Sequence, residues 1–149
     1  MATELLGAKM LAPYFGSSLY VWATVLAVTL GGLALGYFAG GILSYKTKNP
    51  LTVFNVLLAA ATFTILMPYT SKIVLWLIGF HSLIPSVIVC ASVILLPPVF
   101  MMGMVSPLII RAITTDVEQS GKASGGIYAI STLGGIIATF LFGFYIIPA

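Results

Sequence analysis

Long apolar runs, separated by short polar stretches, make up most of this chain. The runs long enough to span a bilayer, which takes about 20 apolar residues, cover about residues 19–45, 51–69, 83–113 and 121–147. A shorter apolar segment at about 1–12 ends at Pro13 and predicts a partial helix. Residues 72–82, with Trp76, predict a short interfacial helix or an extension of the preceding span. The pattern therefore predicts an all-α membrane protein, a single domain (1–149) built as a bundle of about four full transmembrane helices plus these two shorter ones.

Composition and charge agree with this prediction and exclude several classes of protein. Of the 149 residues, 60% are hydrophobic and 6% are charged, which is too little polar surface for a water-soluble fold. The predicted partner is therefore the lipid bilayer, and the net charge of +3 requires no nucleic acid to explain it. Basic residues flank the loops at 46–50 and 114–122, so the positive-inside rule predicts that both loops are cytoplasmic and that the protein lies in the cell (inner) membrane.

Two of the predicted spans carry small residues at helical spacing. In the span at 19–45 the glycines recur at intervals of four, and in the last span Tyr128, Thr132 and Thr139 continue a stripe that glycines begin and end. Small residues let two helix backbones approach closely in lipid. We therefore predict that both spans pack closely, each against a partner helix, with helix-packing positions at Gly32, Gly36, Gly40, Gly125, Gly135 and Gly143.

Sequence motifs for catalysis are missing from the chain. It contains no HExxH, GxSxG, P-loop or CxxC pattern. The single histidine, His81, has no second histidine as a co-ligand, and the single cysteine, Cys90, lies in an apolar run where a small core residue is expected. We predict no catalytic residue, no metal site and no cofactor for this chain alone.

Two ionisable residues interrupt the first apolar segment. Each of Glu4 and Lys9 would cost about 2.5–3.5 kcal/mol at the centre of a membrane helix, so both are expected to face the bundle interior. Tyr128 and Thr132 of the last span can supply hydroxyl groups there. These four residues predict a pocket for a cationic ligand. In the alternative interpretation, Lys9 extends to the headgroups and Glu4 has only a structural role.

Several segments resemble the membrane region of multi-pass spermidine-synthase-like proteins, which is often fused to a major-facilitator-like segment. They include Glu4-LLGA-Lys9, YFGSS, GGLALGYFAGG, PPVFMMGMVSPLIIR and GGIYAISTLGGIIATFLFGFYIIP. In that family the membrane helices precede a soluble domain similar to aminopropyltransferases, and no part of this chain resembles that domain. The resemblance thus implies a non-catalytic multi-pass membrane domain that anchors or serves a soluble aminopropyltransferase-like domain. It also makes a polyamine or a related amine the expected ligand of Glu4.

Two other functions stay open at this point. The chain can be a structural subunit of a larger membrane complex, completed by other membrane subunits or by a homo-oligomer. It can also be half of a small-molecule (amine) transporter, although the loop at 46–50 lacks the Asp and Arg of the usual major-facilitator signature.

Overall fold

The computed structural model describes residues 2–47, 49–78, 83–114 and 120–146. These residues form helices and no strand, which confirms the predicted all-helical bundle. In chain order the elements are α1 (Ala2–Phe15), α2 (Leu19–Lys46), α3 (Pro50–Ile78), α4 (Leu83–Ile113), α5 (Ser120–Leu141) and a π-helical turn, η2 (Phe142–Ile146). Four of the helices, α2 to α5, are long and apolar enough to cross a membrane, so the protein is membrane-embedded.

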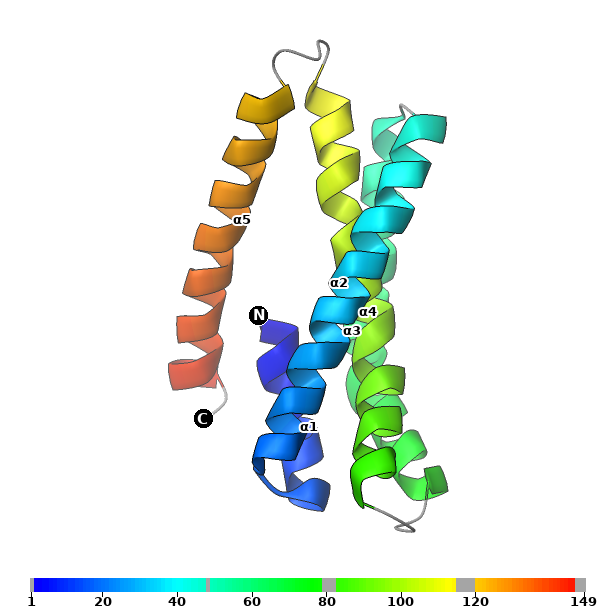
Figure 1. Cartoon of the computed structure of the whole chain (residues 1–149), viewed down its shortest axis with the longest axis vertical. Coiled ribbons are helices and arrows are strands. Elements are labelled where there is room, and N and C mark those ends of the chain that lie inside the picture. Colours follow the sequence, from blue (N-terminus) through cyan, green and yellow to red (C-terminus); the bar gives the residue numbers. More distant parts are fainter. Residues whose placement is uncertain (1, 48, 79–82, 115–119, 147–149) are drawn as a thin grey trace.

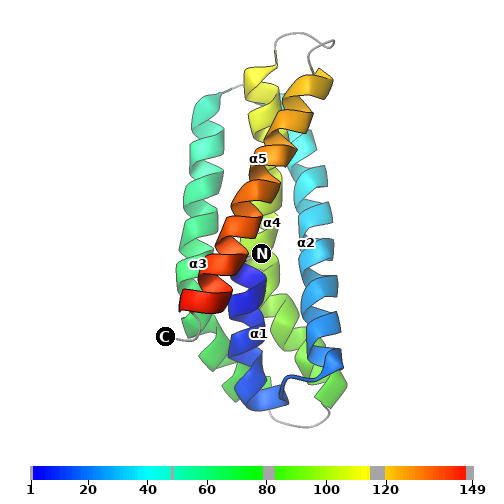
Figure 2. The same ribbon diagram turned by 90° about the vertical axis from the view of Figure 1, so that its left-hand side faces the viewer.

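The long helices run up and down along a common axis (Figures 1 and 2). Helices α2, α3 and α4 lie together, and the shorter α1 lies beside their lower half in Figure 1. Helix α5 stands to one side, close to α4 at its upper end and to α1 and η2 lower down. Its membrane-spanning part contains no buried residue, whereas half of the corresponding part of α4 is buried. Helix α4 is therefore the centre of the bundle and α5 is its most loosely attached member.

Glycines of α2 form the closest contact between two helices. Gly32, Gly36 and Gly40 are all buried, and they lie against α4. A Cβ added at Gly36 would lie 2.9 Å from the Cα of Gly103, and one added at Gly40 would lie 2.7 Å from the Cα of Met104. Real Cβ atoms essentially never come so close to backbone, so only glycine fits these positions of α2 without a shift of the helix.

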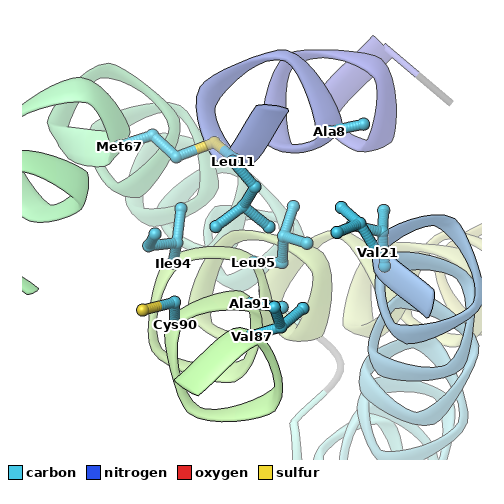
Figure 3. Close-up of a cluster of buried hydrophobic side chains, with 10 residues drawn as sticks. Ala8, Leu11, Val21, Met67, Val87, Cys90, Ala91, Ile94 and Leu95 are labelled. Atoms are coloured by element: carbon cyan, nitrogen blue, oxygen red, sulfur yellow. The ribbon is translucent and has the colours of Figure 1, made fainter. Parts of the chain in front are cut away.

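The apolar core joins α1 to the lower half of the bundle. Leu11 of α1 is fully buried and points toward α4, with Met67 of α3 beside it and Ile94 and Leu95 of α4 below it (Figure 3). Gly7, one turn before Leu11, faces Leu95 so closely that an added Cβ would lie 2.5 Å from its Cδ2 atom. Cys90 is also fully buried in this cluster. The position of α1 is therefore set by the packing of its side chains against α4.

The structure gives two element boundaries that the sequence placed elsewhere or left open. Helix α1 includes Pro13 and ends at Phe15, because Gly16 adopts a left-handed conformation (φ 72°) and donates its N–H to the carbonyl of Ala12 (2.8 Å). Helix α3 continues to Ile78, so residues 72–78 extend the preceding span, which was one of the two predicted alternatives, and residues 79–82 lie outside the described residues. Met67 and Ser71, one turn apart, are both buried, so the packed face of α3 continues past Pro68 and keeps the helix in place.

Candidate functional site

A cavity of about 700 Å³ lies between α5 and the rest of the bundle. Its walls come from the first turns of α1, the middle of α2 and α3, the upper part of α4 and most of α5. The described lining residues are Ala2, Thr3, Glu4, Leu6, Leu33, Tyr37, Thr64, Met102, Ser106, Tyr128, Ser131, Thr132, Gly134, Gly135, Ile136, Ala138, Thr139, Phe140 and Phe142.

Glu4 supplies the charge of this cavity. It lies in the first turn of α1, whose N-terminal end is about halfway along the bundle axis in Figures 1 and 2. Of the described lining residues, Glu4 alone has an ionisable acidic or basic group apart from the tyrosines. Glu4 is half-buried and lines a cavity about midway along the bundle, and acids that face the interior of a membrane bundle are often functional.

Hydroxyl groups supply the remaining polar lining. The Oγ1 atoms of Thr64, Thr132 and Thr139 donate to the carbonyl oxygens four residues earlier in their own helices, at 2.7–2.8 Å. Because these hydrogens are occupied, the three hydroxyl oxygens can serve a ligand only as acceptors. Tyr37, Tyr128, Ser106 and Ser131 bring further hydroxyls from α2, α4 and α5. The site thus suits a ligand that donates hydrogen bonds.

The small residues of α5 line this cavity. Tyr128, Thr132, Gly135 and Thr139 all belong to its wall, whereas a Cβ added at Gly125 or Gly143 would meet nothing within 4 Å. The close packing predicted for this span is thus not formed by Gly125 and Gly143 within the described chain. The small side chains leave space between α5 and α1.

Lys9 lies apart from the cavity. It is exposed and lines a separate hollow of about 220 Å³ with Gly143 and residues of α1 and α2. Five residues after Glu4 on one helix, its side chain is turned about 140° away, which explains the separation. Of the four residues predicted to bind a ligand, Glu4, Tyr128 and Thr132 line this one cavity and Lys9 does not.

Sequence reasoning missed Tyr37, Thr64 and Ser106. They lie on three different helices, and no spacing along the chain connects them with Glu4. For Tyr37 a local signal existed, because the residue follows the packed Gly36 and therefore lies near the α2–α4 contact.

Comparison with known proteins found no matching family model, no similar curated protein and no similar solved structure. Within the described residues, no three His, Cys, Asp or Glu side chains are grouped as metal ligands would be. The chemistry of the site thus follows from one carboxyl group, several hydroxyls and an apolar wall.

Proposed function

We propose that this chain is the non-catalytic membrane domain of a spermidine-synthase-like protein and that it binds an amine between α1 and α5. The observation that carries the proposal is the cavity that unites Glu4 with Tyr128 and Thr132. An ammonium group donates hydrogen bonds and carries positive charge, so it complements a carboxylate in a cavity that also offers hydroxyl oxygens as acceptors. The family resemblance of the sequence supports an amine as the ligand and an aminopropyltransferase-like domain as the partner.

The proposed orientation follows from the basic residues at one end of the bundle. Lys46 ends α2 and Arg111 lies in the last turn of α4. These helix ends and the start of α5 lie together at the top of Figure 1. The positive-inside rule makes this end cytoplasmic in the inner membrane, where the soluble domain would also lie.

Amine binding by the purified protein in lipid nanodiscs tests the proposal. Isothermal titration calorimetry with putrescine, spermidine and octylamine is expected to detect binding of at least one of them. The Glu4→Gln variant should weaken that binding at least about tenfold, or about 1.4 kcal/mol. Lys9→Gln removes one charge from the same helix outside the cavity and should bind as the parent does. If none of the amines binds, or if Glu4→Gln binds them unchanged, the proposal is wrong.

A structural subunit of a larger membrane complex is the second candidate. It is favoured by the open surroundings of Gly125 and Gly126 on α5, where another helix could approach the backbone. The mass of the solubilised particle, measured by light scattering with the detergent contribution subtracted, tests it. A mass well above one chain that falls on Gly125→Leu would support this candidate, and a monomer would exclude a homo-oligomer.

A further inference from the structure

We infer that the ligand of this cavity is a monoamine with a hydrocarbon body, and that it enters sideways from the bilayer past α5. The inference rests on the amine site proposed above and narrows it in two respects, the charge of the ligand and its route. It also departs from the polyamine that the sequence resemblance implies.

The charge of the cavity limits the ligand to one ammonium group. Glu4 is the one acidic residue among the described lining residues. A polyamine would bring several ammonium groups, and all but one of them would lack a carboxylate partner inside the membrane. An unpaired charge in such surroundings is costly, so a single ammonium fits best.

The rest of the wall suits a hydrocarbon body. Leu33, Met102, Ile136 and Phe140 come from three helices and enclose the cavity beside the hydroxyls. Ligand pockets of about 300–1,000 Å³ with a largely apolar lining and a few polar groups are typical of small-molecule sites. The cavity therefore combines one charged group with a largely apolar wall, as a ligand with an ammonium group and a hydrocarbon body would require.

The position of α5 opens the cavity toward lipid. Among the described residues, no Cα atom of α5 lies within 8 Å of a Cα atom of α2 or α3. Apart from η2, which continues it, its neighbours are α4 and α1, and Figure 1 shows α5 diverging from α2 and α4 toward its lower end. In a bilayer the molecules beside such an opening are lipid chains, so an amphiphilic amine dissolved in the membrane can reach Glu4 without crossing the apolar core around Leu11.

Photolabelling in nanodiscs of zwitterionic lipid tests this inference. The probe is an alkylamine with a diazirine in its chain, and the labelled peptides are identified by mass spectrometry. We expect saturable labelling of peptides that contain Leu33 of α2 or residues 134–142 of α5. An excess of octylamine should abolish this labelling, whereas equal concentrations of spermidine or octanol should leave at least about half of it.

Two pairs of variants separate the site from nonspecific partitioning. Glu4→Gln should reduce the saturable labelling at least about tenfold, and Lys9→Gln should retain it. Ala138→Trp fills the cavity wall of α5 and should block labelling, whereas Ala129→Trp alters an exposed residue of the same helix outside the wall. Thermal unfolding of each variant establishes that it is folded, and the Trp pair provides a test independent of Glu4.

The outcomes distinguish this inference from the proposed function. If spermidine competes and octylamine does not, the claims that the ligand is a monoamine and that it enters from the bilayer are wrong. The proposal of an amine site is then still supported. If labelling is unsaturable, or if it is unchanged in both Glu4→Gln and Ala138→Trp, the probe only partitions into lipid and the inference is overturned. If calorimetry also detects no amine, the proposed function fails with it.

Discussion

At the scale of single residues, the contact between Gly36 and Gly103 is sterically restricted from both helices. A Cβ added to either glycine would come within 3.0 Å of the other's Cα. The obstacle is backbone, which cannot rotate away as a side chain can. The packing of α2 against α4 therefore depends on glycine, which has no side chain. In lipid, van der Waals contact between such close backbones takes the place of the hydrophobic effect that joins helices in water.

Alanine at Gly36 is expected to destabilise the bundle, while alanine at Gly31 is not. The added methyl group of Gly36→Ala overpacks the contact and should cost about 1–3 kcal/mol. Gly31 lies on the same helix with nothing within 4 Å of an added Cβ, so Gly31→Ala should be neutral or gain up to about 1 kcal/mol of helix propensity. Thermal unfolding in detergent measures both. Equal melting temperatures for the two variants would contradict the packing described here.

The glycine spacing in the sequence predicted the contact face of α2 but could not predict its partner. Gly32, Gly36 and Gly40 share a face because of helical geometry alone. That this face meets Gly103 depends on the tertiary arrangement, and a single glycine in α4 has no spacing to reveal it. For the same reason the sequence singled out Glu4, an acid in an apolar run, and missed Tyr37, one of many aromatic residues.

At the scale of the helices, α2 packs closely against α4, whereas α5 has few contacts with the rest of the bundle. The spanning part formed by α5 and η2 has no buried residue, and a Cβ added at Gly121, Gly125, Gly126, Gly134 or Gly143 would meet nothing within 4 Å. Local stability follows the density of packed contacts. Motion that widens or narrows the cavity should therefore occur at α5.

Spin-label distances test this difference in mobility. In a Cys90→Ala background, labels at Leu30 of α2 and Val93 of α4 should give a narrow distance distribution. Labels at Ile130 of α5 and Val93 should give a broader distance distribution, because α5 has no close glycine contact like the one between α2 and α4. All three positions are exposed, so the labels themselves disturb little packing. Distributions of the same width would show that α5 is held as firmly as α2.

The helix boundaries show where apolar patterns stop being informative. The sequence left open a separate interfacial helix at 72–82, yet Thr70 and Ser71 donate their hydroxyls to the carbonyls of Met67 and Pro68 (3.0 and 2.9 Å) and stay within α3. A serine can therefore remain in a membrane helix by bonding to its own backbone. The burial of Ser71 against the bundle could not be predicted from local sequence.

At the scale of the whole molecule, the up-and-down order of α2 to α5 sets which segments share a side of the membrane. The end of α2 lies beside the start of α3, and the end of α4 beside the start of α5 (Figure 1). The sequence predicted this alternation from the number of spans. The cavity could not be predicted in the same way, because it depends on the tilt of α5.

Cysteine labelling of intact cells tests the proposed orientation. In the Cys90→Ala background, Thr47→Cys and Thr114→Cys should react with a membrane-impermeant maleimide only after the cells are opened. Ser17→Cys, in the exposed turn between α1 and α2, should react from outside. Labelling of Thr47→Cys in intact cells, with Ser17→Cys protected, would show the opposite orientation.

Because Cys90 is buried, its reaction with a thiol reagent can report opening of the apolar core in the unmodified protein. The sequence has a single cysteine, and its side chain is fully enclosed at the core around α4. A dye that becomes fluorescent on reaction with a thiol can therefore reach Cys90 only when the core opens. Its reaction rate measures how often the core opens. We expect slow alkylation of the parent protein in nanodiscs and acceleration by Leu11→Ala, which removes buried side-chain volume from the same apolar cluster. Because the measurement needs no introduced residue, the alkylation rate of Cys90 can be compared between lipids, ligands and variants. A lower rate means that the apolar core opens less often.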